Sequence, residues 1–472
     1  MPDIRYVCLS DMHLGAQNSL LTNLTANNLS SDTSVPSPVL TSLVTCLKTL
    51  IAQNAGKEKP TLILAGDILE LALTTENLAA MAFERFIELI FPADGEPLFQ
   101  QIYYIPGNHD HHLWETAREM QYVRYLETPK QKPGAFLDVP YHTTSMFTPT
   151  PISSIFLNGI IHRYPHLVHT DIGTIYPNFA LLSEDRRRSI IFTHGHFAES
   201  LYLLMSTMRS YMFPKGERPE LTWDYEAENF AWIDFFWSTM GRSGEVGTDV
   251  EVVYDKLQSD EQVKLLVENL ATGVGTKEGR SSVKNLEETW LLKKVFELVL
   301  LGVRHSERSQ TDDYLTPDAK AGLQKYIEGP VLKQIKIERH DNVPENCALV
   351  FGHTHKPFQT QMNFHGYQPA TNVYNTGGWV IDSEQPQPLI GGAVVLVDEN
   401  LNLTSLRMYN ELKSPADFAV TVETAATPAH QFHERIAKLV DPTQDPWQTF
   451  SKLVVNEIPR RVENLRARMA QW

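Results

Sequence analysis

Five short apolar segments, each ending in a polar turn, constrain the fold of this chain more than any other feature. They read RYVCLSDMH, TLILAGD, IYYIPGNHD, SIIFTHGH and CALVFGHTH. A short apolar run bounded by turn residues predicts a buried strand. We therefore expect five strands, each of which delivers polar side chains at its C-terminal end.

The segments between the first three strands predict helices. Apolar residues over positions 39–51 fall on one helical face, and residues 77–90 show the same period. Strands that alternate with helices predict βαβ units and an α/β core. Ligands of such sheets bind outside the carboxyl ends of the strands, so we expect all five turns to meet in one place.

A long helical stretch interrupts the strand pattern and divides the chain. We predict a core in two parts, over residues 1–196 and 345–410, and a helical insertion over residues 197–344 that forms a lid or substrate wall. Residues 411–472 are expected to form a polar, helical C-terminal extension. Its arginine-rich end is expected to be a solvated helix that carries Arg460, Arg461, Arg466 and Arg468.

Composition limits the classes of function. The chain of 472 residues has a formal net charge of -16, which argues against broad nucleic-acid binding because that binding uses Lys and Arg to neutralise phosphates. Its 3 cysteines are far apart, which fits a reducing cytosol. No secretory signal is evident at the start and no segment is apolar enough to span a membrane, so we expect a cytoplasmic protein.

The polar turns carry residue types that bind metals. A single D-x-H or H-x-H pair is weak, because such pairs are common in ordinary turns. Five turns rich in carboxylates, imidazoles and amides, each after an apolar strand, form a much more specific set. Their candidate residues are Asp11, His13, Asp67, Asn108, His109, His194, His196, His353 and His355.

The ordered set D-x-H, G-D, G-N-H-D, H-G and G-H-x-H resembles the calcineurin-like metallophosphoesterase superfamily over residues 1–200 and 345–410. The resemblance implies an α/β fold, a two-sheet αββα sandwich, here with a large helical insertion, and a two-metal site at the strand ends. The segments YPNF and NTGGW are more loosely similar to bacterial members related to UDP-2,3-diacylglucosamine diphosphatases.

By resemblance, seven residues would hold two divalent cations. The first cation would bind Asp11, His13, Asp67 and His355. The second would bind Asp67, Asn108, His194 and His353. Such donors suit Mn, Fe, Zn, Co or Ni, with manganese as the first candidate. Two metals can clamp both oxygens of a phosphoryl displacement and convert a bridging water into an attacking hydroxide.

The residues after Asn108 have different implied roles. The resemblance makes His109 the general acid at the leaving oxygen. Asp110 either orients the turn or the imidazole, or caps the helix that begins near His111. We expect His111 and His112 to be surface residues. Three further residues are expected to lie near the substrate: His196, Asn375 and Thr376.

These features predict a dinuclear metal-dependent phosphoric ester hydrolase that cleaves a phosphate ester or pyrophosphate bond. Three alternatives remain. The first is a membrane-surface lipid pyrophosphatase that uses the insertion as an acyl groove, the second a phosphodiesterase or nuclease, and the third a non-catalytic scaffold on the same fold. The expected partner is a phosphorylated small molecule or lipid. Nucleic acid is not expected, and peripheral membrane contact stays open.

Overall fold

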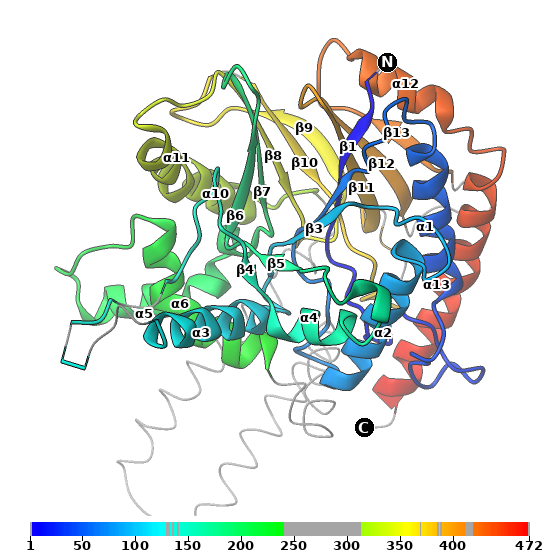
Figure 1. Cartoon of the computed structure of the whole chain (residues 1–472), viewed down its shortest axis with the longest axis horizontal. Coiled ribbons are helices and arrows are strands. Elements are labelled where there is room, and N and C mark those ends of the chain that lie inside the picture. The colour runs from blue at the N-terminus through cyan, green and yellow to red at the C-terminus, as the bar shows by residue number, and fades with distance from the viewer. Residues whose placement is uncertain are drawn as a thin grey trace, which may run out of the picture.

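The structure is a computed structural model with two β-sheets packed between helices (Figure 1). It describes residues 2–128, 133–134, 136–138, 141–239, 313–368, 370–384, 387, 389–410 and 419–470. The first sheet has the strand order β13-β12-β11-β1-β2-β3-β5-β4, and the second has the order β6-β7-β8-β10-β9. This arrangement is the αββα sandwich that we predicted.

The strands and helices alternate along the first part of the chain. The strands are β1 (Ile4–Leu9), β2 (Thr61–Leu64), β3 (Gln101–Tyr104), β4 (Ile152–Ser153), β5 (Gly173–Thr174), β6 (Asn178–Leu182), β7 (Arg188–Thr193), β8 (Asn346–Phe351), β9 (Phe358–Met362), β10 (Thr371–Asn375), β11 (Gly391–Asp398), β12 (Leu403–Asn410) and β13 (Thr421–Glu423). The α-helices are α1 (Pro38–Ile51), α2 (Glu76–Ile90), α3 (His112–Leu126), α4 (Ile155–Ile161), α5 (Leu204–Met212), α6 (Thr222–Ser238), α10 (Pro317–Tyr326), α11 (Leu332–Arg339), α12 (Gln431–Leu439) and α13 (Trp447–Ala470).

Parallel pairing brings the motif turns to one edge of each sheet. Strand β1 pairs in parallel with β2, β2 pairs in parallel with β3, and in the second sheet β7 pairs in parallel with β8. These five strands are the ones expected from the apolar segments, and α1 and α2 are the expected helices. The carboxyl ends of parallel strands share an edge, so the turns of each sheet lie side by side.

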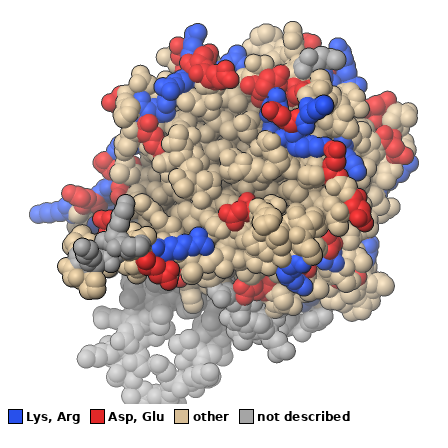
Figure 2. Space-filling model, viewed as in Figure 1, with Lys and Arg blue, Asp and Glu red and all other residues tan. Residues whose placement is uncertain are grey.

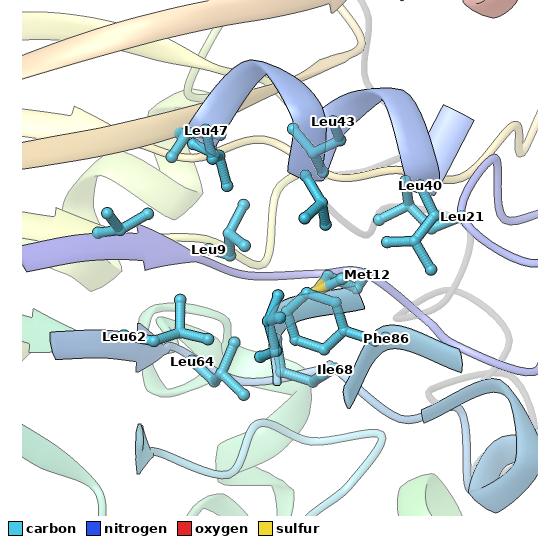
Figure 3. Close-up of a cluster of buried hydrophobic side chains, with 14 of the residues drawn as sticks. Leu9, Met12, Leu21, Leu40, Leu43, Leu47, Leu62, Leu64, Ile68 and Phe86 are labelled. Atoms are coloured by element: carbon cyan, nitrogen blue, oxygen red, sulfur yellow. The ribbon is translucent and has the colours of Figure 1, made fainter. Parts of the chain in front are cut away.

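The first layer of core lies between the first sheet and helices α1 and α2. Ser37 caps α1 by accepting a hydrogen bond from the Leu40 amide at 2.9 Å. The helix buries Leu40, Leu43 and Leu47 at three- and four-residue spacing, against strand residues such as Leu62 (Figure 3). Each fully buried leucine contributes about 1.5–3 kcal/mol.

The second core layer lies between the two sheets. Successive residues of a strand face opposite sides, so Val7 of β1 joins the cluster under the helices and Cys8 joins the cluster between the sheets. Tyr374 of β10 and Val395 of β11 close the same inner layer. Helices α10 and α11, with a π-helical segment between them (Ile327–Val331), cover the outer face of the second sheet.

The C-terminal segment is built into the fold. Strand β13 pairs with β12, and α13 packs against α1. We expected a solvated helix here, and that expectation was wrong. Phe450 and Val454 are buried, and the guanidinium of Arg461, which is 0% exposed, donates to the Thr22 carbonyl at 2.6 Å.

Part of the predicted insertion lies within the described residues, and that part is helical. It comprises α5, α6, α10 and α11, with a short 3-10 segment (Ser200–Leu203) before α5 and the π-helical segment between α10 and α11. Residues 240–312, with the apolar segments and Gly-rich linkers predicted there, lie outside the described residues. None of the described helices is long and apolar enough to cross a membrane.

Candidate metal centre

Hydrogen bonds from backbone amides join turns of the two sheets. The amide of Asp11 donates to the Gly66 carbonyl at 2.9 Å, and the amide of His13 donates to the Asp67 carbonyl at 2.9 Å. The amide of His353, from the second sheet, donates to both Asp11 carboxylate oxygens at 3.0 Å. The prediction that the turns meet in one place is confirmed.

The turns bring metal-binding atoms into overlapping groups. Ligand atoms of Asp11, His13 and His355 lie within 4.8 Å of one another, and so do those of Asp67, His194 and His353. A further group of the same size joins His13, Asp67 and His109. Asp67 thus lies between the two sets of donors that the resemblance assigns to different cations.

Asn108 completes the second set of donors. Its Oδ1 lies 3.0 Å from Nε2 of His194, and the same nitrogen lies 3.3 Å from Oδ2 of Asp67. Nδ1 of His353 lies 3.2 Å from that Nε2 as well. All four side chains are buried, so their polar atoms face one another in a site shielded from bulk water.

The backbone is strained at most of these positions. Positive φ angles, which non-glycine residues rarely adopt, occur at Asp11 (48°), His13 (45°), Asp67 (52°), His353 (70°) and His355 (57°). Each such conformation costs about 1–3 kcal/mol and persists only where the surroundings impose it. Five of the eleven non-glycine residues with positive φ in the described part of the chain lie here, and strain of this kind is typical of functional sites.

Two motif glycines leave room for the carboxylates. A Cβ at Gly352 would contact Oδ2 of Asp11, and a Cβ at Gly107 would contact Oδ1 of Asp67. Glycine in the GNH and GHTH turns therefore lets the backbone of one turn approach a donor of another.

Carboxylates orient two of the imidazoles. Nδ1 of His13 lies 2.8 Å from Oε2 of Glu70, and Nδ1 of His355 lies 3.1 Å from Oδ2 of Asp382. A hydrogen bond at one ring nitrogen fixes the orientation and directs the other nitrogen to a metal. For both residues that other atom is Nε2, and the two Nε2 atoms lie 3.3 Å apart.

The remaining two imidazoles are held in the same manner. Nδ1 of His194 lies 3.1 Å from the carbonyl oxygen of Ala65, which leaves Nε2 toward Asp67. Nε2 of His353 lies 2.9 Å from Oε1 of Glu199, and its Nδ1 faces His194. Our sequence reasoning missed Glu70, Asp382 and Glu199. Only Glu70 offered a local signal, as an acid three residues after Asp67.

Glu70 also holds His109. Oε1 of Glu70 lies 2.9 Å from Nδ1 of His109, and the His109 amide donates to Oδ1 of Asp67 at 2.8 Å. Burial would raise the pKa of Glu70, but the adjacent His109 and His13 lower it well below its usual range. The His109 ring stands edge-on to that of His13, with centroids 4.8 Å apart.

Asp110 makes the contacts of a residue that orients turns. Its carboxylate accepts hydrogen bonds from the amides of Gly107 at 2.6 Å and Ile68 at 2.8 Å, and from the Tyr104 hydroxyl at 2.5 Å. Burial and the charge of Asp67 raise its pKa to about 6. No hydrogen bond joins this side chain to the α3 backbone within the described part of the chain, and the N-cap is His111.

The three residues expected near the substrate are all buried. Asn375 donates to the Gly352 carbonyl at 2.9 Å and to the Thr354 hydroxyl at 3.0 Å, and Thr376 donates to the Phe351 carbonyl at 3.1 Å. Both therefore brace the turn that carries His353 and His355. His196 lies 3.2 Å from the Tyr176 hydroxyl through Nε2, and burial and neighbouring histidines lower its pKa.

The expectation that His111 and His112 are surface residues was wrong. His111 is 0% exposed, with Nε2 2.8 Å from Oε1 of Glu226. His112 is partly buried and pairs with Asp234 through Nδ1 at 3.0 Å. The sequence pattern could not reveal this, because both partners come from α6, more than 100 residues further along the chain.

The donor chemistry fits divalent transition metals. The site offers imidazole nitrogens, two carboxylates and one amide oxygen, with no thiolate in the donor groups. Each of the four candidate histidine ligands has its second ring nitrogen beside a carboxylate or carbonyl oxygen. That support is typical of protein metal sites.

Among the comparisons with known proteins, the family model is the one that identifies a family for this chain. No curated protein matches the chain. Among solved structures, a dimetal phosphatase from Danio rerio matches with 8% sequence identity and a TM-score of 0.31, covering 90% of this chain and 100% of the other. The family model of the calcineurin-like phosphoesterases matches residues 4–267, more than half of the 472 residues. The chain therefore belongs to the calcineurin-like phosphoesterase family.

Proposed function

We propose that the protein hydrolyses a phosphate ester or pyrophosphate bond at the site formed by the five turns, with His109 as general acid. The observation that carries this proposal is the pairing of two donor groups around Asp67, with His109 at their edge. Two metal positions with a buried acid beside them suit phosphoester hydrolysis, because cations would stabilise the phosphate charge and the acid would protonate the leaving oxygen.

The proposed ligand sets follow the two donor groups. Asp11, His13, Asp67 and His355 would hold one cation. Asp67, Asn108, His194 and His353 would hold the other. When bound, such cations neutralise phosphate charge and lower the pKa of a coordinated water, which supplies the nucleophile. Manganese is the first metal to test, because the donors are nitrogen and oxygen atoms without sulfur.

His109 would donate the proton that the leaving oxygen needs. Its Nδ1 pairs with Glu70, so Nε2 is the ring atom that would deliver the proton. As the bond between phosphorus and the leaving oxygen breaks, the proton from Nε2 would join that oxygen. A positioned acid of this kind contributes about 10²–10⁴-fold to the rate.

We propose that the helical insertion over residues 197–344 forms a wall beside the core over residues 1–196 and 345–410. The contact between Glu199 of the insertion and His353 of the core supports this role, together with a cavity of ≈ 420 Å³ beside Glu199. Its lining includes Glu199, which contacts His353, together with Tyr225 of α6 and Lys325 of α10. All of its lining residues belong to the insertion, and the contact between Glu199 and His353 connects it to the second donor group.

For the nuclease alternative, the arginine-rich helix α13 is the candidate contact surface, but its arginines are buried or paired with acids. Arg461 and Arg468 are buried, and Arg466 pairs with Glu384 at 3.0 Å. On the face drawn in Figure 2, the described Lys and Arg residues lie among Asp and Glu residues. A nucleic-acid groove would gather positive charge along one path.

A substrate screen tests the proposal. Metal-stripped protein reconstituted with Mn²⁺, Zn²⁺ or Co²⁺ would be offered a phosphomonoester, a phosphodiester and a lipid pyrophosphate, with Asn108→Ala as control. We expect metal-dependent hydrolysis of at least one compound, and its loss in Asn108→Ala. Stimulation by liposomes would favour the lipid alternative. Hydrolysis of none would favour the scaffold alternative and contradict the proposal.

A further inference from the structure

Helix α6 presents a row of polar side chains to the turn that carries His109, which we call the His109 turn (residues 107–112). Glu226, Asp234 and Ser238 are separated by eight and four residues, so they lie on one face of the helix. All three make hydrogen bonds to residues of this turn. Because α6 belongs to the insertion, these contacts join the insertion to the proposed acid.

Ser238 makes hydrogen bonds to two residues of the His109 turn. Its hydroxyl oxygen accepts a hydrogen bond from the His112 amide at 2.8 Å, and the hydroxyl donates to the His109 carbonyl at 3.3 Å. The serine is 0% exposed, so water does not compete for either contact. One side chain thereby restrains the backbone of His109 itself.

Glu226 joins two of the motif turns. Its Oε1 lies 2.8 Å from Nε2 of His111, and its Oε2 accepts a hydrogen bond from the Tyr176 hydroxyl at 2.9 Å. The same hydroxyl lies 3.2 Å from Nε2 of His196, two residues after His194. The carboxylate is 0% exposed, so it links the His109 turn to the HGH turn inside the protein.

The carboxylates around His111 already have partners within the protein. Ligand atoms of His111, Glu115 and Glu226 lie within 4.8 Å of one another, as in a metal site. However, Arg118 lies 2.6 Å from Oε2 of Glu115 and supplies a positive charge there. Both oxygens of Glu226 already accept hydrogen bonds. A bound cation would have to displace these contacts.

We infer that α6 is a positioning element for the general acid, in which Ser238 and Glu226 hold the His109 turn at the distance from the metal-binding turns that proton donation requires. The inference rests on the role proposed for His109. It gives the helical insertion a part in the chemical step, in addition to its role as a wall. Small displacements of a catalytic group can cost about 10²-fold in rate, so a helix that fixes the turn has a measurable effect.

The test compares two esters whose leaving groups differ in their need for an acid. Phenyl phosphate has a poor leaving group, because phenolate is a strong base. In 2,4-dinitrophenyl phosphate the leaving group is dinitrophenolate, which departs without protonation. The variants are Ser238→Ala and Glu226→Gln. Thr239→Ala and Glu228→Gln are the matched controls, because the Thr239 hydroxyl donates to the Phe235 carbonyl of α6 and Glu228 pairs with Arg209. All are assayed as the metal-loaded full chain, with metal content and Tm measured.

We expect Ser238→Ala to lower kcat for phenyl phosphate by about 10-fold, with less than about 2-fold change for the dinitrophenyl ester. KM, metal content and Tm should stay close to wild type, and both controls should match wild type. Glu226→Gln should show the same selectivity with a larger loss. Equal losses for the two esters, or none, would overturn the inference while the proposed function stands. If wild type hydrolyses neither ester, the same variants are compared on phosphodiesters with the same two leaving groups. If wild type hydrolyses no compound of the substrate screen, the proposed function fails and the inference with it.

Discussion

Glu70 and His109 form a buried pair at the edge of the candidate metal centre, with Oε1 of the acid 2.9 Å from Nδ1 of the imidazole. The second oxygen of the same carboxylate lies 2.8 Å from Nδ1 of His13. One side chain thus orients both a proposed metal ligand and the proposed acid. The backbone amides of Ala72 and Leu73 hold Oε1 at 3.0 and 2.9 Å, so the carboxylate has little freedom to move.

The substitution Glu70→Gln tests this double role. A neutral amide cannot stabilise a charged imidazole at His109, and it can accept a hydrogen bond with only one of its two terminal atoms. We expect kcat to fall by about 10²-fold, with a greater loss for esters that have poor leaving groups. Steady-state kinetics on a series of aryl phosphates would measure this dependence.

Asp94→Asn provides the control for that substitution, because Asp94 is an exposed acid after α2. It should leave the kinetics unchanged. A Glu70→Gln enzyme with wild-type rates across the aryl series would show that His109 works without its carboxylate partner, contrary to our account.

Asp382→Asn should weaken one metal position selectively. Asp382 lies 3.1 Å from Nδ1 of His355, and loss of such a partner typically costs about 10–100-fold in metal affinity. Isothermal titration of metal-stripped protein would measure the change. Glu384→Gln, two residues away and paired with Arg466, should leave the affinity as it is. Equal affinities for wild type and Asp382→Asn would contradict the assignment of His355.

Gly352→Ala should disrupt the site by steric contact. Its Cβ would meet the Asp11 carboxylate and the Ser10 side chain, and such overpacking costs about 1–3 kcal/mol. Urea denaturation would report the loss of stability. Gly159→Ala in α4 is the opposite case, because nothing lies within 4 Å of a Cβ there. That change should stabilise the protein by up to about 1 kcal/mol. The reverse order of stabilities would contradict the packing described here.

The buried His111 makes stability depend on pH. Burial alone would lower its pKa, but the carboxylates of Glu226, Asp234 and Glu115 raise it from 6.5 to about 10. A raised pKa in the folded state contributes stability that is complete below about pH 6.5 and is lost as the pH rises toward 10. Glu226→Gln removes the main cause of the shift.

The Tm difference between wild type and Glu226→Gln should therefore be largest near pH 6.5 and shrink as the pH approaches 10. Thermal unfolding of both proteins in metal-free buffer would measure it. A difference that is constant over this range would mean that His111 is not charged in the folded protein.

The sequence predicts the parts of this site that depend on local pattern. The segments IRYVCL and TLIL are short, apolar and followed by polar turns, so β1 and β2 could be located together with Asp11 and Asp67. The family resemblance placed His355 in one ligand set with Asp11, and Nε2 of His355 lies 3.5 Å from Oδ1 of Asp11 although the residues are far apart in the sequence. The fold class followed from the same motifs.

The parts that depend on tertiary contacts could not be predicted. Glu226 lies on a helix whose period gives no hint that it faces His111. Arg461 appeared to be one of several solvated arginines, yet it is buried because α13 packs against α1. Strands β4 and β5 have only two residues each, too few for any hydrophobic period to appear.

Metal stoichiometry tests the central claim most directly. Metal-stripped wild-type protein would be saturated with Mn²⁺, separated from free metal and analysed by inductively coupled plasma mass spectrometry, alongside Asn108→Ala and Asp67→Ala. We predict two ions per chain for wild type, one for Asn108→Ala, and loss of both for Asp67→Ala, whose carboxylate belongs to both proposed ligand sets. A wild-type chain that binds no metal, or an Asp67→Ala chain that still binds two ions, would contradict the account.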